Sequence, residues 1–395
     1  MKDVQLGQRL FNWGILFTLS AASALRGVRD NLRAVVWQPF ALSLGLNMQE
    51  IGGLESLIDL MKLIFEPALG AISDALGRKK LLILREILVV AAIVLLLFAR
   101  SWHLLFVSMA LIGISSAFIS IWGSVVAESA ELNSLGFIYS VMGVCYTGAG
   151  LVGTLAAGYL ADRFGYGTVY AVATGFAFLS LAVVWLRLPE TMKEKPKKVN
   201  WYKTATAAFK ALNPPMELRG FYVAMGLDLF AFGMGVRLLS GMLSKGYGYT
   251  SWMIGLYVAA MTLTQAVGQI FTGRLADKFG YTRFMAAAQF SSCVMLAMMI
   301  YSKEFAFVFA AHLLFGLSNS FWIPAEQAWI AAHVDPKERA QALGSFSTVR
   351  GLIGFPAPII GGILFDAFGF DVPIALNLVI VFIDAVLILL WVKDK

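Results

Sequence analysis

The stretch GAISDALGRKK, residues 70–80, returns in altered form as GRLADKFGYTR, residues 273–283. The two starting positions, 273 − 70, differ by 203 residues. AGYLADRFGY (157–166) likewise resembles GGILFDAFGF (361–370) at an offset of 204. The same offset of 203 relates two pairs of glycines: Gly45 with Gly248, and Gly113 with Gly316. A chain that repeats itself in this way predicts two halves with the same fold in the same orientation.

The composition indicates a membrane protein. The chain has 395 residues, of which 59% are hydrophobic and 14% charged, and its mean hydropathy is +0.76. Twelve apolar stretches are long enough to cross about 30 Å of hydrocarbon: 11–39, 50–72, 81–99, 103–127, 135–161, 167–187, 220–243, 251–275, 284–301, 305–331, 341–365 and 372–392. We therefore expect an all-α polytopic membrane protein with twelve transmembrane helices in two pseudo-symmetric six-helix bundles. The expected boundaries are 1–188 for the first bundle, 189–219 for a cytoplasmic linker and 220–395 for the second bundle.

The first segment has a competing interpretation as a cleavable secretory signal. Lys2 and Arg9 precede a short apolar run and three small residues, 22–24. The repeat argues against cleavage, because its register places Leu25 opposite Asp228 in the seventh span. We expect the first segment to remain as a span.

Lysine and arginine are distributed unevenly between the two ends of the expected spans. Twenty lie on the side that carries both termini, whereas the other side has only four: Arg100, Arg163, Lys245 and Lys303. Lysine and arginine in short loops favour the cytoplasmic side of a membrane. We therefore expect a protein of the plasma membrane with both termini in the cytoplasm. The net charge of +7 then reflects topology, and no nucleic-acid partner is expected.

The loop at 70–80 resembles a signature of the major facilitator superfamily, G-x-x-x-D-[RK]-x-G-[RK]-[RK], and the resemblance covers nearly the whole chain. It implies a transporter in which this loop acts as a conformational latch; a topogenic turn without a gating role is the alternative. Ala75 departs from the pattern, and Met109 stands where a fourth-span arginine is usual. A fifth-span antiporter motif is also reduced, which weakens a multidrug antiporter assignment. The expected gating residues are Gly70, Asp74, Gly77, Arg78, Gly273, Asp277 and Gly280.

Charged residues form a stripe on each of the first two spans. At about 100° per residue, Arg26, Arg29, Asp30 and Arg33 share one face, as do Glu55, Asp59, Lys62 and Glu66. Such faces must point into a bundle or a water-filled cavity. They either pair with one another to hold the spans together or contact the transported solute and its coupling ion.

The number of intramembrane charges favours function, since buried ion pairs are a weak source of stability. Arg33 and Arg237 differ by 204 positions, so the two halves could clamp a phosphate or carboxylate between them. The expected substrate-binding residues are Arg26, Arg29, Arg33, Lys62, Arg237, Gln265 and Gln269.

Asp228 is the first candidate for proton coupling, because no basic residue stands three or four positions from it. Glu66 is second, and Asp30, Asp59 and Glu55 complete the set. Asp384 in the last span fits either a relay residue or a bond to a neighbouring helix.

We therefore expect a secondary active transporter, proton- or ion-coupled, that moves a small polar anion by alternating access; proton-driven efflux of drugs or cations is the alternative. The sequence offers no Walker-type G-x-x-x-x-G-K-[ST] motif for a pump. It also offers no nucleophile, base or metal cluster for an enzyme, so no catalytic residues, metal or cofactor are expected. The expected partners are the small-molecule solute, protons and the lipid bilayer, and the chain is expected to be a monomer.

Overall fold

The computed structural model describes residues 13–129, 135–191, 216–334 and 339–394, which contain α-helices and no strand. The first half contains α1 (Trp13–Ser43), α2 (Met48–Leu76), α3 (Arg78–Leu97), α4 (Trp102–Ser116), α5 (Ile119–Ser129), α6 (Leu135–Phe164) and α7 (Tyr166–Arg187). The second half contains α9 (Met216–Met234), the 3₁₀ turn η2 (Val236–Leu238), α10 (Leu239–Tyr247), α11 (Ser251–Phe279), α12 (Tyr281–Tyr301), α13 (Phe305–His333), α14 (Arg339–Gly354), α15 (Ala357–Phe368) and α16 (Asp371–Trp391).

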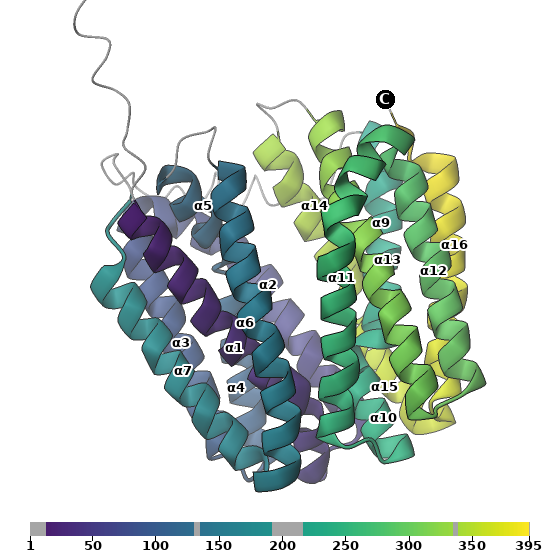
Figure 1. Ribbon diagram of the computed structural model, residues 1–395, viewed down its shortest axis with the longest axis horizontal. Helices are drawn as coiled ribbons and strands as arrows, with labels where there is room; N and C mark the ends of the chain where they lie inside the picture. The colour runs from purple at the N-terminus through teal and green to yellow at the C-terminus, as the bar shows by residue number, and fades with distance from the viewer. Residues whose placement is uncertain (1–12, 130–134, 192–215, 335–338, 395) are drawn as a thin grey trace, which may run out of the picture.

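These helices form the twelve expected spans. Three spans are each interrupted once: α4 is followed by α5 after Ala117 and Phe118, α9 by α10 through η2, and α14 by α15 at Pro356. Proline lacks a backbone N–H and clashes with the preceding turn, which explains the last break. The predicted fold of two six-helix bundles is confirmed, and Figure 1 shows the bundles side by side.

Within the described part of the chain, nine helical segments are long and apolar enough to cross a membrane. The spans missing from this set are α1, α2 and α3. All three contain several ionisable side chains in their middle turns. Because such side chains are costly next to lipid, these helices must turn their charged faces inward.

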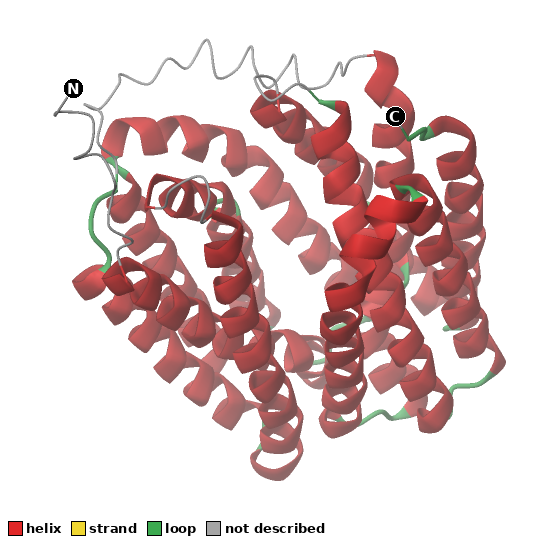
Figure 2. Ribbon diagram, turned by 45° about the horizontal axis from the view of Figure 1, so that its top comes forward, coloured by secondary structure: helices red, strands yellow, loops and turns green. Residues whose placement is uncertain are grey.

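The two halves are joined tightly at one end of the molecule only. We call the end at which α1 begins and α16 finishes the terminal side, and the other end the opposite side; the terminal side is uppermost in Figure 1. On the opposite side one continuous apolar core takes residues from both halves, including Trp37, Ile51, Met242 and Tyr257. On the terminal side each half has a separate core. Figure 2 shows the ribbons of the two halves spread apart at that end.

Close backbone crossings seal the opposite side. A Cβ on Gly52 of α2 would lie 2.8 Å from the carbonyl carbon of Pro358 and 2.9 Å from Cα of Ile359, both on the second half. Gly158 approaches Ser251 in the same way. Glycine is required where two backbones come this close.

Candidate functional site

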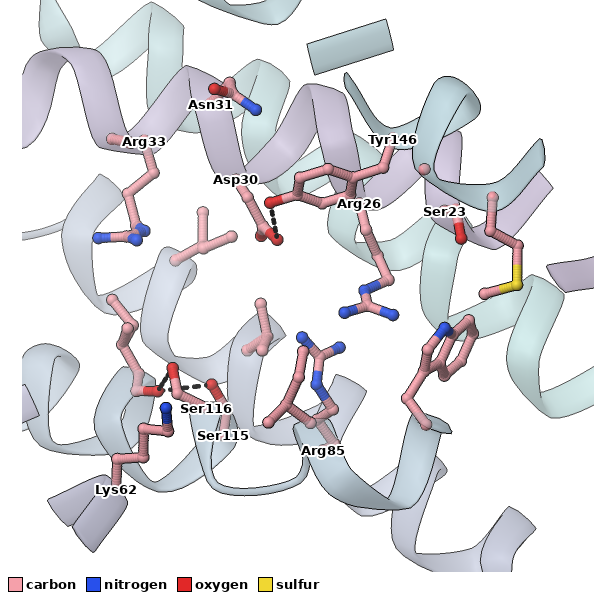
Figure 3. Close-up of a pocket in the computed structure, with 18 of the residues that line it drawn as sticks. Ser23, Arg26, Asp30, Asn31, Arg33, Lys62, Arg85, Ser115, Ser116 and Tyr146 are labelled. Carbon is pink, nitrogen blue, oxygen red and sulfur yellow. Dashed lines mark hydrogen bonds between the residues drawn. The ribbon is translucent and has the colours of Figure 1, made fainter. Parts of the chain in front are cut away.

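A cavity of about 640 Å³ lies among α1 to α6 of the first half. We call it the N-half cavity. Four cationic side chains line it, namely Arg26, Arg33, Lys62 and Arg85, together with one carboxylate, Asp30. Figure 3 shows these side chains directed into the same space. The predicted inward direction of the charged face of α1 is therefore confirmed for Arg26, Asp30 and Arg33.

Arg26 is the most unusual of these cations. Its guanidinium lies 4.5 Å from the centre of the Trp122 ring, and only 6% of the residue is exposed. Its Nε has no hydrogen-bond partner among the described residues. A buried donor without a partner is costly, and it is available to a ligand that brings an acceptor.

Arg29 takes a different place from its neighbours. It is fully buried and is not part of the cavity lining: Nε bonds to Asp30 at 2.9 Å and Nη1 to Glu86 at 2.6 Å. Arg85 also pairs with Glu86, which accepts a further bond from Ser180 at 3.0 Å. Arg29 therefore ties α1 to α3, and its expected role in substrate binding stays a prediction.

Arg85 and Glu86 were not anticipated from the sequence as members of the site. The signal was available, because they are two adjacent charges within the third apolar stretch. Glu86 supplies a partner for Arg29 on α1, and Arg85 pairs with Glu86 on α3 itself. The alternative expectation is that the charges of spans one and two neutralise one another. Asp30 agrees with it, because it pairs with Arg29 of its own span, whereas Asp59 does not, because it pairs with Arg237 of the second half.

Arg237 does not line the N-half cavity, so the expected clamp of Arg33 and Arg237 is not formed. Its guanidinium is held by α2: Nη2 lies 2.7 Å from Glu55, and Nη1 pairs with Asp59. The carbonyl oxygen of Arg237 also accepts a bond from Gln38 of α1 at 2.8 Å. Arg237 thus joins the two halves.

Most hydrogen bonds between the described halves lie toward the opposite side. Gly241 N donates to Gln38 at 2.8 Å, Gln49 N donates to Asp366 at 2.8 Å, and Ser251 N donates to Asp162 at 3.0 Å. With the Arg237 pairs they form what we call the opposite-side gate. Glu66 is not part of the opposite-side gate. It accepts a 3.5 Å hydrogen bond from Ser347 of α14.

Gln265 and Gln269 on α11 are half-buried and belong to neither cavity described here. These two expected substrate-binding residues therefore do not line the N-half cavity. Of the expected binding residues, that cavity contains Arg26, Arg33 and Lys62.

A second cavity of about 550 Å³, the C-half cavity, contains Asp228, Gln289, Glu326 and Arg350. Arg350 donates to Glu326 at 2.8 Å and to Asp228 at 3.3 Å. The expectation that Asp228 has no compensating cation is therefore wrong, because the cation comes from α14 and not from its own helix. The Arg350 bonds therefore join α14 to α13 and to α9.

The two repeated loops each contain a glycine in a conformation that other residues rarely adopt. Gly77 has φ = 94° and Gly280 has φ = 96°. A carboxylate accepts a hydrogen bond from a backbone N–H in the first turn of the helix that follows each glycine. Glu190 accepts from Arg78 N at 3.0 Å, and Asp394 accepts from Thr282 N at 3.1 Å. The acids are 394 − 190 = 204 residues apart, so they repeat with the loops, a match that the sequence analysis did not use.

Arg78 also forms a 3.1 Å ion pair with Glu128 at the end of α5, which holds the first loop against the fourth span. Gly70, Gly273 and the side chains of Asp74 and Asp277 lie outside the residues whose side-chain surroundings are described. The latch role of these residues stays a prediction.

Two repeated six-helix bundles, each with a polar cavity, are an arrangement typical of membrane transport proteins. The sequence model of the Major Facilitator Superfamily matches residues 18–243 and 221–395, so the chain belongs to that family. It is an integral membrane protein and a secondary transporter.

Two of the known proteins with related sequences are named for drug resistance. Multidrug resistance protein MdtG of Dickeya zeae is 23% identical over 84% of this chain and 81% of its own length. Tetracycline resistance protein, class G, of Vibrio anguillarum is 27% identical over 78% of both chains. The crystal structure of the human organic anion transporter MFSD10 has the same fold, with a TM-score of 0.70 and 18% identity over 95% of this chain and 99% of its own.

Proposed function

We propose that the chain carries a small organic anion across the membrane by alternating access, with the N-half cavity as its binding site. The observation that supports this most strongly is the excess of positive charge: four cations and one carboxylate share the cavity lining. Glu86 and Arg29 lie behind them and neutralise each other. The cavity is left with a positive field that attracts an anion.

The side chains that line the N-half cavity favour one class of anion, those with a phosphate or carboxylate group. Guanidinium groups bind such groups through two parallel N–H bonds, and Arg26 has a free Nε for this purpose. Val89, Ile93 and Met142 add an apolar wall that suits an organic portion. The volume of about 640 Å³ is in the usual range for small-molecule sites.

The arrangement of the halves supports a carrier rather than a pore. The opposite-side gate is closed by ion pairs and glycine crossings, whereas the halves have separate cores on the terminal side. We propose that the terminal side is cytoplasmic, as the lysine and arginine distribution favours. The structure then represents the state open to the cytoplasm, and rocking of the halves would open the gate.

Proton-driven efflux of cationic or amphipathic compounds is the second candidate. It is favoured by the acidic residues of the C-half cavity, Asp228 and Glu326, and by the resistance functions in the names of the two sequence relatives. In this alternative the cation would bind in the C-half cavity.

A thermal-shift panel on the purified full-length protein separates the two candidates. Anything that binds the folded state raises its unfolding temperature. We expect stabilisation by at least one member of an anion set of inorganic phosphate, glucose 6-phosphate and benzoate. Tetraphenylphosphonium and ethidium form the cation set and are expected to give none. Stabilisation by the cation set alone would refute the anion assignment and support efflux.

A further inference from the structure

Two carboxyl groups meet at one amide nitrogen deep in the second half. Gln289 Nε2 on α12 donates to Asp384 Oδ2 on α16 at 2.6 Å and to Asp228 Oδ1 on α9 at 3.0 Å. Asp384 is completely buried and Asp228 is 6% exposed. The second oxygen of Asp384, Oδ1, has no hydrogen-bond partner among the described residues.

The positive charge available to this group is smaller than its negative charge. Arg350 of α14 bonds to Asp228 and to Glu326 of α13, and no cation bonds to Asp384 within the described part of the chain. Gln289 is the polar group facing Asp384 from α12, and Asn377 lies two turns away on α16 itself. Three carboxyl groups therefore share one guanidinium, and Asp384 is the one that the guanidinium does not reach.

A bound proton resolves this imbalance. A carboxylate buried without a cation costs several kcal/mol, and protonation removes the charge. A metal ion fits less well, because cations such as Ca²⁺ and Mg²⁺ require several oxygen ligands, whereas a nitrogen donor, Gln289 Nε2, occupies the position between the two acids. No cluster of three metal-ligating side chains occurs among the described residues.

We propose that Asp384 is the proton-binding residue of the transport cycle, and that Gln289 and Asp228 connect it to the C-half cavity. The proton forms an O–H bond with the Asp384 carboxylate and leaves by the reverse step to water in the cavity, which Gln289 and Asp228 line. This rests on the proposed transport function and moves the coupling site from Asp228, to which Arg350 bonds, to its neighbour on α16, to which no cation of the described residues bonds.

Infrared difference spectroscopy on the purified full-length protein tests the assignment without any substrate. A neutral carboxyl group has a carbonyl band that a carboxylate lacks and that shifts in deuterated water. We expect wild-type protein to show such a buried band at acidic pH and to lose it as the pH is raised. Asp384→Asn should lack the titrating band. Asp371→Asn, the matched control at the exposed start of α16, should keep it.

Further variants separate the possible explanations. Asp384→Glu should restore a titrating band, and Asp228→Asn should retain the band of Asp384. Persistence of the full band in Asp384→Asn, or its removal from the wild type by sodium at constant pH, would overturn the proposal. Because these readouts contain no anion, they can fail while the thermal-shift panel succeeds, and the reverse is also true.

Discussion

Replacing Arg26 with glutamine is expected to weaken binding of the transported anion by about 10- to 100-fold. Charge-assisted hydrogen bonds contribute about 1.5–3 kcal/mol, and each 1.4 kcal/mol corresponds to about tenfold in affinity. No carboxylate bonds to Arg26 among the described residues, so its removal breaks none of the ion pairs reported above. The protein should therefore remain folded, with a loss of binding as the main effect.

Binding of the most stabilising anion of the panel, measured by titration calorimetry, provides the test. Arg26→Lys keeps the charge but loses the planar fork, and we expect it to bind more weakly than the wild type. Arg100→Gln makes the same change in net charge at an exposed site on the opposite side and should bind normally. Wild-type affinity in Arg26→Gln would exclude the N-half cavity as the site.

Replacing Gly52 with alanine is expected to shift the protein toward the state in which the opposite side is open. The new methyl group would overlap the backbone of Pro358 and Ile359 across the interface of the halves. Overpacking of this kind costs about 1–3 kcal/mol, which changes the ratio of the two states about 5- to 150-fold. The strain disappears when the halves part at this end, so only the closed state is penalised.

Gly53→Ala is the matched control, because a Cβ there lies 3.8 Å from the nearest atom, an ordinary contact with Ile359. Ser56 is buried in the same interface and accepts a hydrogen bond from Ile359 N at 3.2 Å. The substitution Ser56→Cys therefore places a thiol that becomes accessible when the opposite side opens. In a background with Cys145 and Cys293 replaced by alanine, labelling by an impermeant thiol reagent should be faster in Gly52→Ala than in Gly53→Ala. Equal rates would contradict the closed interface described above.

The fold could be predicted from the sequence because its signals are local and repeated. Apolar stretches of membrane-spanning length located all twelve spans, and the offset of 203 or 204 residues showed two halves. The breaks within the fourth, seventh and eleventh spans were not predicted, although Pro356 marks the last of them. No proline marks Ala117 and Phe118, and none marks η2, which begins after Gly235 and contains Arg237.

The candidate site was only partly predictable, because its partners come from distant helices. The helical spacing of Arg26, Asp30 and Arg33 identified one face, but it could not show that Arg29 turns to Glu86. Arg237 was matched to Arg33 by register, yet its actual partners are Glu55 and Asp59. The sequence analysis looked for a cation near Asp228 only on the same helix, whereas the cation that pairs with Asp228 comes from α14.

Entrance counterflow tests alternating access of an anion most directly. Liposomes containing the purified protein are loaded with the panel anion that stabilises it most, and a trace of the same anion, labelled, is added outside. A carrier exchanges the two, so we predict a transient accumulation of label above its outside concentration. This overshoot should be absent in empty liposomes and strongly reduced in Arg26→Gln. Uptake that only equilibrates would indicate a pore, and an overshoot obtained only with tetraphenylphosphonium would contradict the anion site.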